Sequence, residues 1–120
     1  MKSSKKVVKR PWGEFEQFSE NELSTVKILS IKPKQELSLQ AHKKREEFWK
    51  IIEGNAIVTI GKKEINAKAG DSFLIKKGQV HRLKSKLKKV RVLEISFGKF
   101  DETDEVRIED KYGRSSPKKK

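Results

Sequence analysis

Apolar and polar positions alternate with a period of two along most of this chain, which is the pattern of β-strands with one buried face. No stretch shows the spacing of a long amphipathic helix. Short β-rich runs are separated by Gly, Pro, Asn or Lys-rich turns at intervals typical of an all-β barrel. The strands that this pattern predicts are residues 15–18, 25–31, 36–42, 47–52, 56–60, 64–67, 72–75, 81–83 and 90–97.

Turn residues support this order of strands. Gly61-Lys62-Lys63 predicts a hairpin tip between two of the runs, and Pro33 ends the second run because proline cannot donate to a ladder. No internal repeat or linker divides the chain. We therefore expect one domain over residues 10–114, with a flexible basic N-terminus over residues 1–9 and a disordered basic tail over residues 115–120.

One predicted strand carries an unusual polar face. In residues 36–42 the side chains of Ser38, Gln40 and His42 point one way, while Leu37 and Leu39 point the other. If the polar side faces solvent, it is an ordinary wet face. If it faces inward, its groups need hydrogen-bond partners, water or a metal ion.

The charge is strongly biased toward basic residues, with 30 Lys and Arg against 17 Asp and Glu, for a net charge of +13. Such a balance favours anionic partners. The lysines are scattered as short pairs, mostly in predicted turns, and no recognition helix or aromatic RNA-binding strand is present. We expect a small anionic ligand and no specific nucleic acid, although a basic nucleic-acid-binding barrel stays open as an alternative.

Other classes are excluded more directly. The chain has no cysteine, so disulfides and thiolate metal ligands are absent. The opening MKSSKK lacks the apolar core of a secretory signal, and nothing approaches the roughly 18 apolar residues of a membrane span. We expect a cytoplasmic protein without membrane contact.

Two histidines, one carboxylate and one amide fall at positions where strands of one barrel can bring them together. Gln40 and His42 lie on one side of a strand, Glu47 can return from the next strand after a turn, and His81 can arrive from a distant strand. Nitrogen and oxygen ligands of this kind suit Zn²⁺ first, with Fe²⁺, Mn²⁺, Co²⁺ or Ni²⁺ as alternatives.

Five short motifs occur in a fixed order in this sequence and carry a family resemblance. They are RPWG from Arg10, LSLQxH from Leu37, RxExW from Arg45, HRL from His81 and DxYGR from Asp110. Together they resemble the cupin domain of type II mannose-6-phosphate isomerases, which in many bacteria follows a mannose-1-phosphate guanylyltransferase domain. The resemblance implies a double-stranded β-helix, or jelly-roll barrel, covering nearly the whole chain.

The resemblance also implies roles for individual residues. It implies that Gln40, His42, Glu47 and His81 bind one divalent metal ion. It implies a cleft for the sugar phosphate, with candidates Lys27, Arg45, Arg82, Arg107 and Tyr112. The implied reaction interconverts mannose 6-phosphate and fructose 6-phosphate through an enediolate. Glu47 is the first candidate for the catalytic base, with Glu94 and a metal-bound hydroxide as alternatives.

Three positions depart from the family pattern. Phe48 stands where the family usually has His, Lys76 replaces a proline and Ser85 replaces an asparagine. Strand alternation points Phe48 away from Glu47, so we expect the metal site to persist. Lys76 and Ser85 are expected in loops at the cleft mouth. The Phe48 change supports an alternative function, a non-catalytic sugar- or metabolite-binding cupin. Because cupin barrels often pair through sheet edges, we also expect a homodimer.

Overall fold

The chain forms an all-β structure, described here by a computed structural model for residues 6–101 and 103–113. Within these residues there are strands and turns but no helix, and therefore no helix that could cross a membrane. The strands are β1 (Lys6–Arg10), β2 (Gly13–Gln17), β3 (Ser24–Ile31), β4 (Leu39–Ala41), β5 (Glu46–Glu53), β6 (Asn55–Ile60), β7 (Lys63–Lys68), β8 (Ser72–Ile75), β9 (His81–Ser85), β10 (Val90–Phe97) and β11 (Val106–Glu109).

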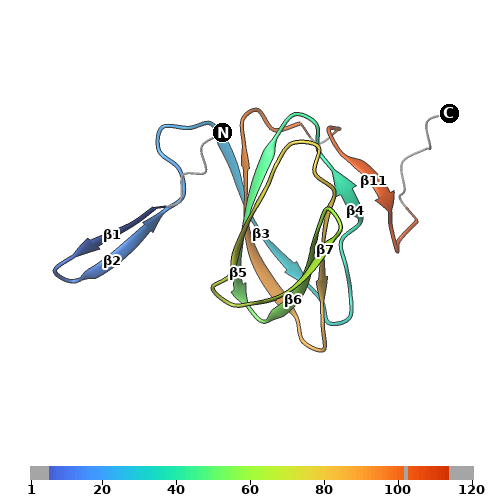
Figure 1. Ribbon diagram of the computed structural model, residues 1–120, viewed down its shortest axis with the longest axis horizontal. Helices are drawn as coiled ribbons and strands as arrows, with labels where there is room; N and C mark the ends of the chain where they lie inside the picture. The colour runs from blue at the N-terminus through green and yellow to red at the C-terminus, as the bar shows by residue number, and fades with distance from the viewer. Residues whose placement is uncertain (1–5, 102, 114–120) are drawn as a thin grey trace.

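Two sheets form the barrel. One has the strand order β3-β10-β5-β8 and the other β11-β4-β9-β6-β7, with antiparallel pairing throughout. Strands that are far apart in sequence lie side by side in both sheets, so the chain crosses repeatedly between them (Figure 1). This arrangement confirms the predicted all-β jelly roll.

The space between the sheets is filled by the inward residues of both. Trp49 and Ile51 of β5 and Val92 of β10 meet Val58 of β6 and Leu83 of β9 in one buried cluster. The predicted alternation is confirmed here, because each of these residues is separated from the next inward one on its strand by one outward residue. This apolar cluster occupies part of the interior and leaves the remainder to polar groups.

A second, smaller cluster lies on the outer face of the four-stranded sheet. Phe48, Ile95 and Phe97 are buried there, with Phe18 and Leu93 packed against them. The ring centroids of Phe18 and Phe48 are 5.3 Å apart. The connection between β2 and β3 therefore covers this patch, and Phe48 points away from the barrel interior as predicted.

The tight turn between β5 and β6 depends on glycine. Gly54 has a φ of +88°, and a Cβ there would lie 2.5 Å from the carbonyl oxygen of Lys89. Both the backbone conformation and the close approach exclude a larger residue. The turn fixes the offset between the two sheets, because β5 belongs to one and β6 to the other.

The structure differs from the sequence prediction at three strands. Residues 6–10 form β1, which pairs with β2 as a separate two-stranded arm that projects from the barrel (Figure 1). The strand β11 was not predicted: its apolar and charged residues alternate, but the run is only four residues long. The predicted strand over residues 36–42 is regular only in β4, since Glu36 makes a single bridge to Lys84. The flexible N-terminus was predicted over residues 1–9; residues 6–9 instead belong to β1, while residues 1–5 and the predicted tail over residues 115–120 lie outside the described residues.

Candidate metal centre

The five-stranded sheet supplies the two imidazoles. Gln40 of β4 is the register partner of His81 of β9, so their side chains lie next to each other on the inner face. His42 follows β4 directly, two residues after Gln40 and on the same side. Ser38, Gln40, His42 and His81 are all buried, which settles the orientation of the polar face: it faces inward.

The four-stranded sheet supplies the carboxylate. Glu47 lies on β5 opposite Ser96 of β10 and is only 1% exposed. Its Oε2 atom accepts hydrogen bonds from Arg45 Nε at 2.9 Å and from Ser96 Oγ at 3.2 Å. These two donors fix one oxygen of the carboxylate and leave the other, Oε1, facing His81.

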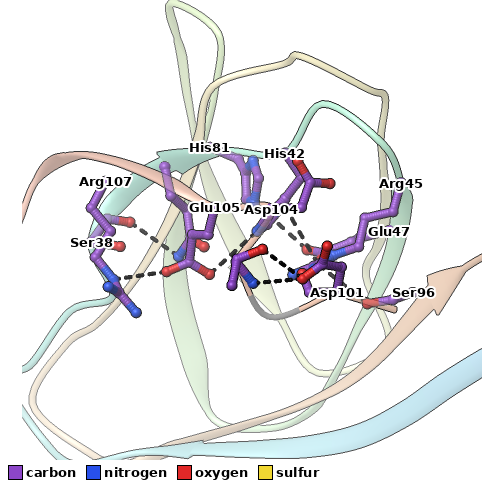
Figure 2. Close-up of polar contacts among 12 residues, drawn as sticks. Ser38, His42, Arg45, Glu47, His81, Ser96, Asp101, Asp104, Glu105 and Arg107 are labelled. Carbon is purple, nitrogen blue, oxygen red and sulfur yellow. Dashed lines mark hydrogen bonds and ion pairs between the residues drawn. The ribbon is translucent and has the colours of Figure 1, made fainter. Parts of the chain in front are cut away.

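Three potential ligand atoms converge at this point, seen in Figure 2. His81 Nε2 lies 3.6 Å from Glu47 Oε1, and His42 Nδ1 lies 3.6 Å from Glu47 Oε2. The atoms that the three residues offer all lie within 4.8 Å of one another. Within the described chain, His42 Nδ1, Glu47 Oε1 and His81 Nε2 are buried and have no hydrogen-bond partner.

The far nitrogens of both rings have acceptors, and this sets the state of the near nitrogens. His81 Nδ1 donates to the carbonyl oxygen of Gln79 at 2.8 Å, and His42 Nε2 lies 3.4 Å from Glu105 Oε1. A carbonyl or carboxylate oxygen only accepts, so the proton of each neutral ring belongs on the far nitrogen. The near nitrogens then present lone pairs to the same point.

These residues fit a divalent metal ion. Buried polar atoms without partners are costly, and a cation would satisfy all three at once. Two neutral imidazoles and one carboxylate form a common mixed ligand set for first-row metals. Gln40 would add an amide oxygen, because its Nε2 atom donates to the Ser38 carbonyl at 3.4 Å and leaves the oxygen available.

Two buried carboxylates in this region are pushed in opposite directions. Burial raises the pKa of Glu47, but contact with His81 and the positive charges of His42 and His81, when these are protonated, and of Arg45 outweigh it and bring the pKa down to about 2. Burial and the nearby charge of Glu47 raise the pKa of Glu94 to about 7, despite a hydrogen bond from Trp49. Glu47 is thus held ionised, while Glu94 can take up and release a proton near neutral pH.

A small cavity of about 170 Å³ opens beside the convergent ligands. Three of the five predicted phosphate-binding residues line it, namely Lys27, Arg45 and Arg107. Lys27 is the register partner of Glu94, and Arg107 is the register partner of Gln40. Both sheets therefore contribute a cation to a cavity that also contains Glu47, Glu94 and Glu105.

The other two predicted phosphate-binding residues lie elsewhere. Arg82 follows His81 on β9 and points to the opposite face, where it pairs with Glu36 and Glu109, each at 3.2 Å. Tyr112 is 51% exposed, and its hydroxyl donates to Gln35, away from the ligands. The structure does not bring either side chain to the cavity, because strand alternation separates Arg82 from His81 and Tyr112 lies beyond β11.

The departures from the family pattern also lie away from the ligands. Phe48 belongs to the outer cluster. Ser85 was predicted in a loop at the cleft mouth, but this prediction is wrong, because Ser85 is a buried residue at the end of β9. Its Oγ atom contacts the Lys32 and Gln35 carbonyl oxygens at 2.6 and 3.0 Å. Lys76 does lie in a loop, after β8.

Sequence reasoning missed a segment that brings a further acidic residue, Glu105, to the lining of the cavity. Asp101, Asp104 and Glu105 belong to an irregular stretch between β10 and β11, where no periodic pattern marks their orientation. Asp104 accepts hydrogen bonds from the backbone N–H groups of Lys43 and Lys44 at 3.0 and 2.8 Å. This brings Glu105 beside His42 (Figure 2).

Comparison with solved structures supports the fold. Oxalate decarboxylase from Bacillus subtilis superposes with a TM-score of 0.67 at 22% identity, covering 72% of this chain and 24% of that one. A Klebsiella pneumoniae protein described as having a double-stranded β-helix domain gives a TM-score of 0.58 at 28% identity, covering 65% and 69%. The barrel is therefore a cupin.

Comparison of sequences identifies the family. The xanthan biosynthesis protein XanB of Xanthomonas campestris pv. campestris is 37% identical over 110 residues, covering 90% of this chain and 24% of the relative. The mannose-1-phosphate guanylyltransferase ManC of Salmonella typhimurium is 36% identical over 109 residues, covering 89% and 23%. The chain spans about a quarter of the length of these relatives. A family model described as mannose-6-phosphate isomerase C-terminal matches residues 1–110, so the chain belongs to that family and is a sugar-phosphate isomerase-like cupin.

Proposed function

We propose that this chain is a metal-dependent aldose–ketose isomerase that interconverts mannose 6-phosphate and fructose 6-phosphate. The observation that carries the proposal is the convergence of His42 Nδ1, Glu47 Oε1 and His81 Nε2, all buried and without a hydrogen-bond partner in the described chain. Gln40 completes the proposed ligand set, with Zn²⁺ as the first candidate ion. The family of the chain supports the choice of reaction and substrate.

The chemistry requires a base near the substrate carbons. Isomerisation moves a proton from C2 to C1 through an enediolate, while a hydroxyl proton passes from O2 to O1. A bound divalent metal would supply Lewis-acid stabilisation of the negative charge that develops on the sugar oxygens. The protein must supply the group that carries the carbon-bound proton, and such groups work best with a pKa near the working pH.

Glu94 meets this requirement better than Glu47, the first candidate from the sequence. Glu47 accepts hydrogen bonds from Arg45 and Ser96 and has a pKa of about 2, so it binds a proton poorly. Glu94 lines the same cavity, and the Trp49 indole donates to its Oε2 atom at 3.1 Å. Two carboxylates with separated pKa values suggest separate roles: Glu47 as a ligand and Glu94 as the base.

The three cavity cations would hold the substrate's phosphate. Arg45 already donates to Glu47 and to the Asp101 carbonyl, so it acts first to position the ligand. Lys27 and Arg45 both lie against the Phe100 ring, 4.3 and 4.6 Å from its centroid. Lys27 and Arg107, one from each sheet, are therefore our first candidates for direct contact with the phosphate.

Metal analysis and a coupled isomerase assay on the purified chain test the proposal together. We expect one divalent ion per chain and turnover of mannose 6-phosphate that chelator abolishes and added metal restores. Metal binding without turnover of any hexose phosphate would favour the non-catalytic cupin instead. Absence of a bound metal at micromolar concentrations would contradict the metal centre itself. The homodimer also stays a prediction, which sedimentation of the same sample checks.

A further inference from the structure

Glu105 lies next to the metal ligands without belonging to the convergent set. It immediately precedes β11, whose Val106 and Arg107 are the register partners of Ala41 and Gln40 on β4. The pairing of these two strands carries Glu105 to the residue that follows Ala41, which is His42. The Glu105 side chain is 19% exposed, at the border between the cavity and solvent.

Both oxygens of the Glu105 carboxylate are occupied. Oε1 lies 3.4 Å from His42 Nε2, the ring nitrogen farther from the ligand cluster, and Oε2 lies 2.7 Å from Arg107 Nε. Arg107 thus holds the carboxylate from one side while His42 meets it from the other, as Figure 2 shows. An ionised carboxylate accepts and cannot donate, so His42 must carry its proton on Nε2 to satisfy this contact.

We propose that Glu105 is a positioning residue that fixes His42 in the Nε2–H tautomer and so keeps Nδ1 free to bind metal. This inference rests on the proposed metal function of the site. The other histidine needs no such help, because the backbone carbonyl of Gln79 sets the His81 tautomer. His42 lacks an equivalent backbone acceptor among the contacts of the described residues, and the side chain from the segment before β11 takes that place.

The same segment is anchored to the turn that follows His42. The Asp104 carboxylate accepts from the backbone N–H groups of Lys43 and Lys44, and Arg45 Nη1 donates to the Asp101 carbonyl at 3.1 Å. Glu105 can reach His42 only while these contacts hold the segment in place. Metal affinity should therefore depend on Glu105 directly and on Asp104 indirectly.

Metal titration of the full chain, stripped by chelator, tests the inference with Zn²⁺ as the probe. We expect Glu105→Gln to weaken Zn²⁺ binding about 10- to 100-fold, the range found when the hydrogen-bond partner of a metal-bound histidine is removed. Asp104→Ala should weaken binding by a smaller factor. The matched control is Glu109→Gln, which removes one negative charge from the adjoining strand β11 at a residue paired with Arg82. It should leave the affinity unchanged.

Nitrogen NMR of the imidazole rings gives a second readout that a purely structural role would not move. In the metal-free wild-type protein, His42 should show the Nε2–H tautomer, and Glu105→Gln should populate the Nδ1–H form. Wild-type affinity in Glu105→Gln, or an Nδ1–H tautomer for His42 in the wild type, would overturn the inference. Failure of the wild-type chain to bind Zn²⁺ would instead contradict the proposed metal centre.

Discussion

The two sheets that enclose the cavity contribute different chemistry. The five-stranded sheet and the residue after β4 provide the amide of Gln40, the imidazoles of His42 and His81, and one cation, Arg107. The four-stranded sheet provides charged and titrating groups, namely Glu47, Glu94 and Lys27. The comparison teaches that the proposed metal centre draws its ligands from both sheets, whereas the base proposed for proton transfer comes from the four-stranded sheet.

The largest expected effect comes from replacing the two histidines that are proposed to bind the metal. His81→Ala and His42→Ala should each reduce bound metal from one ion per chain to nearly none, because two ligands cannot hold the ion that three or four hold. Metal analysis after gel filtration measures this, with circular dichroism as the check on folding. Arg82→Ala, on the same strand but facing outward, is the matched control. Full metal stoichiometry in either histidine variant would show that the ligand set is wrong.

A substitution of Glu94, on the four-stranded sheet, should separate catalysis from metal binding. Glu94→Gln should lower kcat about 10²- to 10⁴-fold, the usual contribution of a positioned base, while metal content stays at the wild-type level. Steady-state kinetics on mannose 6-phosphate measures the loss, and Glu64→Gln on the exposed side of β7 serves as the charge control. Near wild-type kcat in Glu94→Gln would return the base role to another group.

The same residue should give the metal-free protein a distinctive pH dependence. The pKa of Glu94 is raised in the folded state. Between pH 4.5 and about 7 the folded protein therefore keeps a proton that the unfolded chain releases. Its contribution to the free energy of unfolding is fully present below pH 4.5 and is lost as pH rises through about 7. For a rise from 4.5 to about 7, the loss is at most about 3 kcal/mol.

Urea unfolding in chelator at pH 5 and pH 8.5 measures this loss. The free energy of unfolding of Glu94→Gln should lack this decline with pH, because glutamine does not titrate. The variant should therefore be more stable than the wild type at pH 8.5. An equal decline with pH in both proteins would mean that Glu94 does not titrate in this range.

The smallest expected effect lies outside the cavity. Arg82→Ala removes an ion pair to the partly buried Glu36 and one to the exposed Glu109, both away from the cavity. We expect the KM for mannose 6-phosphate to change less than about twofold, whereas Arg107→Ala should raise it clearly. A KM increase in Arg82→Ala comparable to that in Arg107→Ala would place Arg82 at the substrate.

Much of the fold followed from alternation along the chain. The opposite orientation of Phe48 and Glu47 was correctly predicted, because a strand allows only two faces. The arm strand β1 and the short strand β11 were missed. The apolar and polar residues of β1 do not alternate regularly, and β11 alternates over only four residues, so each strand depends on the partner with which it pairs.

The sequence alone determined the chemical types of the candidate ligands and the side of the strand on which each one lies, because side-chain direction in a strand is a local property. Only the tertiary structure decided what depends on groups distant in sequence. It brought Arg107 to the cavity, and it placed Glu105 beside His42. It also raised the pKa of Glu94 by burying it near Glu47. Burial, tautomers and pKa values arise from packing between segments, and no single segment encodes them.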